Sequence, residues 1–200
     1  MDCGKVGALL YGLRREKGMT QKQVAQYLNI SDKAVSKWER GLGFPDVSLL
    51  SELSALYGVK IESILGGNLE ANRLEAGNLK RVRFYVCPVC GNIVYNTGKS
   101  EISCCGRKLA PLIAQPADAE HAVSVEDTDG QYYVTFNHAM SKAHFLSFVA
   151  YVANDRVLLV KLYPEQEASV FLPKLAGGKL PPAGRNILFF YCTQHGLFSM

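Results

Sequence analysis

The sequence lacks any apolar run that approaches the roughly 20 residues of a membrane-spanning helix. Its first residues, Met1 to Gly4, form no basic patch leading into an apolar stretch, so we expect no secretion signal. Charge of one sign is also scarce: 22 basic and 18 acidic residues leave a net charge of +4, too little to establish a nucleic-acid partner by itself. These absences predict a cytoplasmic protein with no membrane partner. In that compartment, six cysteines favour metal binding over disulfides.

Apolar material is sufficient for a folded core, because 48% of the residues are hydrophobic and 20% are charged. A helical pattern comes first, then a polar stretch that is either a linker or a short helix, then a cysteine-rich part and finally strand-like segments. We find no internal repeat. We therefore predict a multidomain α+β protein with an all-α domain, a linker, a metal module and a β domain, at residues 1–66, 67–83, 84–115 and 116–200.

The last of these parts holds segments rich in Val, Ile, Leu, Phe and Tyr, which predict β-strands. The expected strands cover residues 131–136, 145–152, 156–163, 169–172 and 186–192. Polar residues typical of turns lie at 127–130 and 154–155.

Two short helices joined by a turn are predicted for residues 20–41. Thr20 and Gln23 fit a capping box at the start of the first helix, and Ser31 is a suitable N-cap for a second helix that ends at Gly41. On the second helix one apolar stripe faces inward and polar side chains cover the rest of the circumference. A helix of this kind suits the major groove of DNA.

The stretch 20–45, with Val24-Ala25, Leu28, Trp38-Glu39 and Gly41, resembles the XRE (lambda-repressor-like) helix-turn-helix family, and the resemblance extends over residues 4–65. It implies binding to a double-stranded DNA operator, as a homodimer that reads paired half-sites. The residues that it assigns to bases are Asp32, Lys33, Ser36 and Lys37, and those near phosphates are Gln21 and Ser31. The alternative is a helical bundle with a solvated charged face. Trp38 itself is expected in the core.

A pair of cysteines two residues apart, Cys87 and Cys90, is followed by an adjacent pair, Cys104 and Cys105, and a glycine follows each pair. Four converging thiolates select zinc or iron, and the alternative is buried or disulfide-bonded cysteine. The segments 84–94 and 104–109 resemble the desulforedoxin module. This resemblance implies one iron held as Fe(Cys)4, with a role in electron transfer.

All four histidines lie in the strand-rich part, and His195 follows Cys192 at a Cys-x-x-His spacing. Neutral imidazoles and a thiolate suit a transition metal, although a lone histidine is more often structural. The segments 138–144 and 191–198 resemble superoxide reductase of the desulfoferrodoxin family, and with the cysteine module the match covers 84–200. The resemblance implies an immunoglobulin-like β-sandwich and a second iron, held by His121, His138, His144, His195 and Cys192. It also implies reduction of superoxide to hydrogen peroxide, with electrons from a donor such as rubredoxin or a reductase.

The sequence departs from that family at two positions. Glu120 precedes the first ligand histidine where the family usually has a lysine that attracts superoxide, and Ala139 stands where proline is common. A carboxylate at position 120 is expected to slow the approach of an anion. Lys142, which lies between two ligands, is a candidate to compensate.

Three hypotheses fit these motifs. The first is a superoxide reductase that carries a DNA-binding domain, and the second is a transcriptional regulator that uses the iron sites as sensors of redox state or superoxide. In the third, zinc occupies both sites and the C-terminal half is a dimerisation scaffold. Cys3 matches no site.

Overall fold

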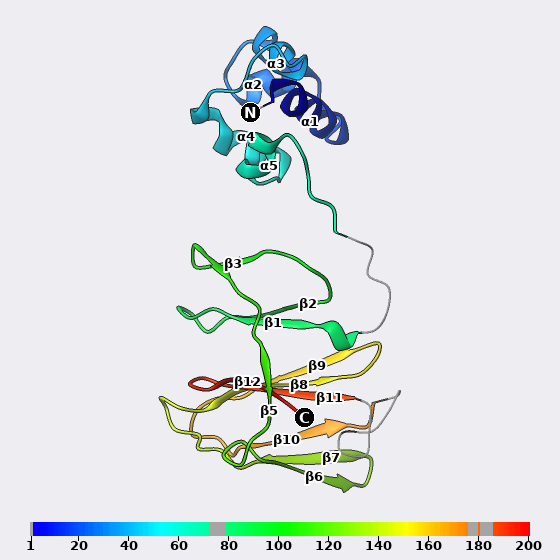
Figure 1. Cartoon of the computed structure of the whole chain (residues 1–200), viewed down its shortest axis with the longest axis vertical. Helices are drawn as coiled ribbons and strands as arrows, with labels where there is room; N and C mark the ends of the chain where they lie inside the picture. Colours follow the sequence, from blue (N-terminus) through cyan, green and yellow to red (C-terminus); the bar gives the residue numbers. More distant parts are fainter. Residues whose placement is uncertain (1, 73–78, 176–179, 181–185) are drawn as a thin grey trace. The chain divides into compact units, whose positions relative to one another are not determined.

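The computed structural model describes residues 2–72, 79–175, 180 and 186–200. The chain divides into two compact units, residues 1–71 and 72–200 (Figure 1). This division falls inside the polar stretch 67–83, of which residues 73–78 lie outside the described residues. Among the described residues, no helix combines the length and the apolar character needed to cross a lipid bilayer.

Unit 1 is helical, as the sequence predicts, and its capping residues act as expected. Gln23 N–H donates to Thr20 Oγ1 at 3.2 Å, and Thr20 N–H donates to Gln23 Oε1 at 2.8 Å. Ser31 Oγ accepts from Ala34 N–H at 3.3 Å. The elements are α1 (Cys3–Glu16), α2 (Gln21–Tyr27), α3 (Asp32–Glu39), η1 (Val47–Leu49), α4 (Leu50–Tyr57) and α5 (Ile61–Gly66).

The core of unit 1 lies where these helices meet. Trp38 is 7% exposed, which confirms its expected place in the core. Gly7 of α1 lies so close to the carbonyl oxygen of Trp38 that a Cβ at position 7 would collide with it. Because glycine allows this approach, α1 and α3 pack directly against each other. Other core residues are Val6, Leu10, Leu13, Val24, Leu28, Val35, Leu53 and Ile64.

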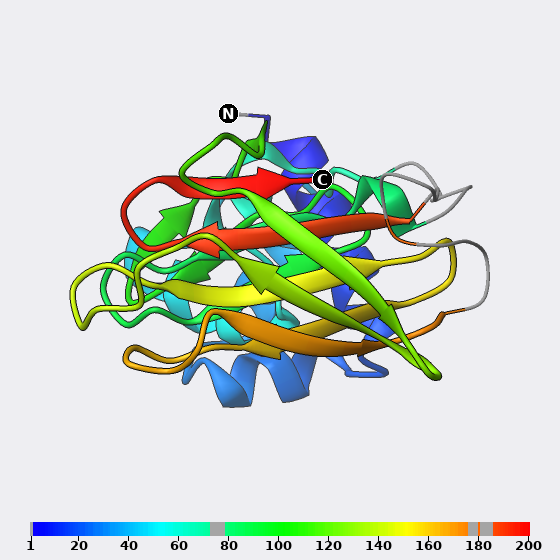
Figure 2. The same ribbon diagram turned by 90° about the horizontal axis from the view of Figure 1, so that it is seen from below.

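Unit 2 is rich in β-structure (Figure 2). After η2 (Leu79–Arg81) come two hairpins formed by β1 (Arg83–Val86), β2 (Ile93–Asn96), β3 (Ile102–Cys104) and β4 (Arg107–Leu109). A three-stranded sheet has the order β10-β7-β6, from β10 (Ser169–Pro173), β7 (Gln131–Phe136) and β6 (Val123–Thr128). A five-stranded sheet has the order β5-β12-β11-β8-β9, from β5 (Ala114–Pro116), β12 (Gly196–Ser199), β11 (Ile187–Cys192), β8 (Leu146–Val152) and β9 (Val157–Lys161).

All five predicted strands are present as β7 to β11, with ends that differ by at most two residues. The predicted turn at 127–130 is too long, because β6 continues to Thr128 and leaves a two-residue turn, Asp129-Gly130. β6 has an exposed face, so its polar residues alternate with Val123 and Val125 and hide the strand pattern. The short strands β5 and β12 are additions to the prediction.

The five-stranded sheet is covered on both faces (Figure 1). One face packs against the three-stranded sheet through Tyr151, Leu188 and Phe190. The opposite face packs against β1, where the Phe84 ring lies 5.4 Å from Phe148. This double burial explains why β8 is a continuous apolar run rather than an alternating one. The cysteine-rich part and the strand-rich part therefore lie in one unit, and β5 runs across the predicted boundary at residue 115.

Candidate metal centres and DNA-contacting surface

The four predicted cysteines of the module converge at one point. The Sγ atoms of Cys87, Cys90, Cys104 and Cys105 all lie within 4.8 Å of one another. Cys90 and Cys104 Sγ are 3.6 Å apart, and Cys104 and Cys105 Sγ are 4.0 Å apart. Thiolates bound tetrahedrally at about 2.3 Å from a metal would be separated by about 3.8 Å. None of the six cysteines forms a disulfide, so the spacing fits a single metal ion.

Backbone conformation explains both cysteine pairs. Between β3 and β4 the two-residue turn consists of Cys105 (φ 49°) and Gly106 (φ 72°), both left-handed, as in a type I′ hairpin. Cys104 ends the strand and Cys105 begins the turn, so adjacent residues direct both sulfur atoms to one site. At the other pair, Gly91 (φ 67°) closes the loop and its N–H donates to the carbonyl of Cys87 at 2.9 Å.

The thiols differ in their acidity. Hydrogen bonds from the backbone N–H groups of Cys90 and Val89 lower the pKa of the Cys87 thiol to about 6. The neighbouring thiols, led by Cys90, raise the pKa of Cys105 to about 12. Neighbouring thiolates oppose one another's deprotonation. A cation bound at this point would offset this repulsion, because it stabilises all four thiolates together.

The second site is assembled from three loops of the sandwich. His121 comes from the connection between β5 and β6, and Cys192 and His195 flank the turn between β11 and β12. His138 and His144 both lie between β7 and β8, where Ser141 and His144 are joined by two backbone hydrogen bonds of 2.9 and 3.3 Å. This compact turn brings His144 back beside His138, with ring centroids 4.5 Å apart.

The donor atoms of this second site are separated by distances typical of atoms that coordinate the same metal ion. His121 Nε2 is 3.0 Å from His195 Nδ1, and Cys192 Sγ is 3.3 Å from His138 Nε2 and 3.2 Å from His144 Nε2. Ligands at right angles around one metal, with bonds of about 2.1 Å to nitrogen and 2.3 Å to sulfur, would be separated by about 3.0–3.1 Å. The donor atoms of His121, His138, Cys192 and His195 all lie within 4.8 Å of one another, and His144 joins them through its contact with Cys192, so the predicted ligands fit one transition metal.

Burial and backbone hydrogen bonds define the surroundings of two of these ligands, Cys192 and His138. Cys192 is fully buried, because at the end of β11 it lies on the same face of the strand as the core residues Leu188 and Phe190. The backbone N–H groups of Gln194 and His195 each point at Cys192 Sγ from 3.4 Å. Burial also lowers the pKa of His138, so its neutral form prevails at pH 7.

Asp118 is a site residue that the sequence reasoning missed. Its Oδ1 lies 2.7 Å from His121 Nδ1 and also accepts from the backbone N–H of His121 at 2.9 Å. Such a carboxylate fixes the histidine tautomer and leaves Nε2 free for the metal. An aspartate three residues before a predicted ligand, in a turn, was the available signal.

The pocket above the second site has a volume of about 290 Å³ and is open to solvent. Glu120 lines it together with four histidines, Asn137 and Ala139. Lys142 is not among the lining residues, and its Nζ lies 3.9 Å from Glu165 Oε1. Of the two charged candidates, only Glu120 therefore lines this pocket.

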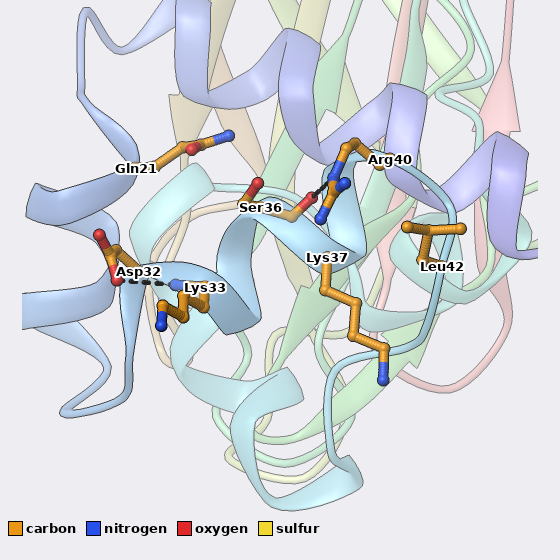
Figure 3. A pocket seen from close by; sticks show the side chains of 7 residues that line it. All are labelled: Gln21, Asp32, Lys33, Ser36, Lys37, Arg40 and Leu42. Carbon is orange, nitrogen blue, oxygen red and sulfur yellow. Dashed lines mark hydrogen bonds between the residues drawn. The ribbon is translucent and has the colours of Figure 1, made fainter.

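A second hollow, of about 500 Å³, lies on the exposed face of α3 (Figure 3). Five of the six predicted DNA contacts line it: Gln21, Asp32, Lys33, Ser36 and Lys37. Ser31 lies outside this lining and serves as the N-cap of α3. Arg40 and Leu42 also line the hollow, although the sequence reasoning did not assign them to DNA.

A buried ion pair supports this surface. The Arg14 Nε donates to Glu39 Oε1 at 2.6 Å, and Gln21 Nε2 donates to Glu39 Oε2 at 2.9 Å. The side chains of Arg14 and Glu39 are 9% and 3% exposed. Glu39 thus connects α1, the start of α2 and the end of α3, which gives the Trp-Glu pair of the sequence motif a structural role.

Comparison with known proteins finds matches to two different kinds of protein. Residues 10–64 match the helix-turn-helix family model HTH_3. Over 126 residues the chain is 30% identical to a desulfoferrodoxin of Desulfarculus baarsii, a match that covers 58% of this chain and 94% of the relative. This chain belongs to the desulfoferrodoxin family. The helix-turn-helix match at residues 10–64 lies within unit 1.

Two further similarities were found, one to a helix-turn-helix regulator and one to a superoxide reductase. Over 80 residues the chain is 36% identical to the HTH-type transcriptional activator BcrR of Enterococcus faecalis, covering 38% of this chain and 39% of the relative. The crystal structure of the superoxide reductase from Treponema pallidum aligns with a TM-score of 0.50 and 17% identity, covering 60% of this chain and 96% of that chain. The latter is a similarity of fold.

Proposed function

We propose that this desulfoferrodoxin reduces superoxide to hydrogen peroxide at an iron held by the four histidines and Cys192. The observation that carries the proposal is that the donor atoms of His121, His138, Cys192 and His195 lie within 4.8 Å of one another at an open pocket. His144 Nε2 lies 3.2 Å from the same sulfur. A structural zinc site is typically closed and four-coordinate, whereas this set leaves one side open. We also assign the sandwich to the immunoglobulin-like class, with its loops at one end holding the ligands.

Iron bound at this site would supply the electron for a one-electron reduction of superoxide at the position left open by the five ligands. Each superoxide takes one electron and two protons to give one hydrogen peroxide, so an external donor must return the electron. The residues of this chain prepare the site. Asp118 orients His121, and the backbone N–H groups of Gln194 and His195 point at the Cys192 sulfur, where they would stabilise a thiolate. The open pocket admits both the anion and the water that supplies protons.

Glu120 acts against the approach of the substrate in this proposal. Its carboxylate lines the pocket, and a negative charge there repels an anion. Lys142 lies beside Glu165, so its charge does not offset that of Glu120 at the pocket. The local electrostatic field therefore slows the entry of superoxide into the pocket, while all five metal ligands are retained.

Unit 1 is proposed to bind a double-stranded DNA operator as a homodimer, with α3 in the major groove. The matched family model and the polar lining of the hollow on α3 support this assignment. Lys33 and Lys37 are suited to guanine edges, and Ser36 to either purine. The module with four thiols is proposed to hold a second iron for electron transfer.

The deciding experiment combines metal analysis with kinetics. Anaerobically purified full-length protein should contain two irons per chain, and the reduced form should consume superoxide and yield an equal amount of peroxide in stopped flow. Cys192→Ser should lose this reaction, and Cys3→Ser, outside both sites, should retain it. Iron-loaded protein that leaves superoxide unchanged would disprove the enzyme assignment.

A parallel test addresses DNA. Lys33→Ala and Lys37→Ala should each weaken binding to an operator selected from random sequence by about 1–3 kcal/mol. Lys5→Ala, on α1, serves as the matched control. Operator binding that is equally strong in all three variants would contradict the assignment of α3.

A further inference from the structure

The hollow on α3 contains one side chain that cannot form hydrogen bonds with DNA. Six of the seven described residues that line it are polar or charged, and the seventh is Leu42 (Figure 3). The Leu42 side chain is 59% exposed. A single exposed leucine is common on protein surfaces, but this one lines the same hollow as the predicted DNA contacts Lys33 and Lys37. Its position therefore favours a ligand that offers an apolar group there.

Backbone hydrogen bonds fix the position of Leu42. Its N–H donates to the carbonyl of Lys37 at 3.0 Å, and the Gly41 N–H donates to the carbonyl of Trp38 at 2.8 Å. With the left-handed conformation of Gly41 (φ 72°), these bonds form a Schellman motif at the end of α3. The residue at the position of Leu42 frequently packs against an apolar residue of the last helical turns. The residues at those positions here are Ser36 and Lys37, so Leu42 remains exposed.

Two cationic side chains of α3 line the hollow together with Leu42. A Cβ at position 43 would lie 3.2 Å from Lys37 Cε and 3.6 Å from Lys37 Cδ, so the methylene groups of Lys37 run alongside the loop that carries Leu42. The Arg40 Nε donates to the carbonyl of Ser36 at 3.2 Å, which holds the guanidinium against the end of the helix. An apolar side chain therefore lies among donors that suit guanine edges and phosphates.

We propose that Leu42 contacts the 5-methyl group of a thymine in the major groove and thereby selects an A·T base pair in each half-site. Among the four bases of DNA, only thymine presents a methyl group in that groove, and apolar side chains recognise it by direct contact. The selected base pair is expected to neighbour the one that Lys37 contacts, because both side chains line one hollow. The proposal rests on the proposed binding of unit 1 to DNA.

A second protein surface is the competing ligand for an exposed leucine. The buried centre of a stable protein interface is apolar and depleted of charge. The described residues that line the hollow with Leu42 instead include three cations, Lys33, Lys37 and Arg40. DNA supplies both the phosphates that attract these cations and the methyl group that suits Leu42, so the lining favours DNA.

The test uses the full-length protein and an operator selected from random sequence. Each thymine of the operator is replaced in turn by deoxyuridine, which removes the 5-methyl group and leaves the hydrogen-bonding groups of the base unchanged. The affinity of the wild type should fall about fourfold at one thymine in each half-site, as expected for the loss of one buried methyl group. Leu42→Ala should bind the thymine and uracil operators equally at that position. Leu42→Met, which keeps an apolar side chain of similar size, should retain the preference for thymine.

The matched control is Leu69→Ala, because Leu69 is a 47% exposed leucine of unit 1 that does not line the hollow. This variant should discriminate between thymine and uracil as the wild type does. The proposal would be overturned if no thymine showed the effect in the wild type, or if Leu42→Ala kept the full discrimination.

Two further outcomes separate the possible causes of failure. If Leu42→Ala lost affinity for every operator equally and no longer formed a homodimer, Leu42 would lie at an interface between copies and the proposal would be wrong. If selection enriched no operator, and Lys33→Ala and Lys37→Ala left DNA binding unchanged, the proposed DNA binding of unit 1 would be wrong as well. An enriched operator that Leu42→Ala binds with unchanged discrimination would overturn the role of Leu42 alone.

Discussion

The two metal sites of unit 2 are built in opposite ways. The four thiols all come from residues 87–105, on two tight turns, and two of them are exposed. The five ligands of the second site are spread from His121 to His195, and Cys192 among them is fully buried in the sandwich. The first site is local in sequence, so we expect it to depend on a bound metal for its order, whereas residues of the hydrophobic core position the second.

Among the variants that test this difference between the two sites, Cys104→Ser is expected to have the largest effect. Metal binding supplies most of the folding free energy of small modules of this kind, on the order of 10 kcal/mol. The variant should therefore lose the metal of the four-thiol site and the protection of amides in residues 87–109 against hydrogen exchange. Because the two ligand sets share no residue, the second metal should remain, and the metal content should fall from two to one. Loss of both metals would show that the sites are not independent.

Phe190→Ala tests the dependence of the second site on the core. Phe190 is fully buried between the rings of Phe136 and Phe198, at centroid distances of 5.0 and 5.5 Å. Its truncation should destabilise unit 2 by about 3–5 kcal/mol in denaturant unfolding. Phe171→Ala, at a 59% exposed position, is the control and should cost much less. Similar losses for both variants would contradict a site that is held by the core.

Asp118→Ala should have an intermediate effect. Without the carboxylate, the His121 ring is free to rotate and to change tautomer, and the affinity of the second site for metal should fall about 10–100-fold. Competition with a chelator measures this change. Asp129→Ala, in the turn between β6 and β7, should leave the affinity unchanged. An unchanged affinity in Asp118→Ala would mean that neighbouring side chains alone fix His121.

The smallest effect is expected from Glu120→Lys, which alters the field and leaves the ligands in place. The variant should raise the second-order rate with superoxide by up to about tenfold at low ionic strength, and salt should reduce the gain. Glu126→Lys, on the exposed face of β6, makes the same charge change away from the pocket. If the two variants behave alike, Glu120 does not act at the pocket.

The four-thiol site and most of the fold could be predicted because their signals are local in the sequence, whereas the ligand set of the second site was predicted from a family resemblance. The capping residues of α2 and α3, the paired cysteines and the long apolar runs of β8 and β11 each depend on near neighbours. Asp118 was missed because its role depends on the orientation of one histidine ring. β12 was missed because its two buried residues gain their place by pairing with β11. Contacts that exist only after the chain has folded leave little trace in sequence order.

The cover that β1 provides for the five-stranded sheet constrains how this protein can evolve. Phe84 lies over Phe148 and Phe189, so the first hairpin protects an apolar face of the sheet as well as carrying cysteines. A related protein could lose the four cysteines and still keep the hairpin, whose apolar side chains cover the sheet. It could not delete the hairpin without exposing that face to water, unless another segment or a second chain took its place. The apolar residues of β1 and the cysteines that follow it are therefore under separate selection, the first for stability and the second for the four-thiol site.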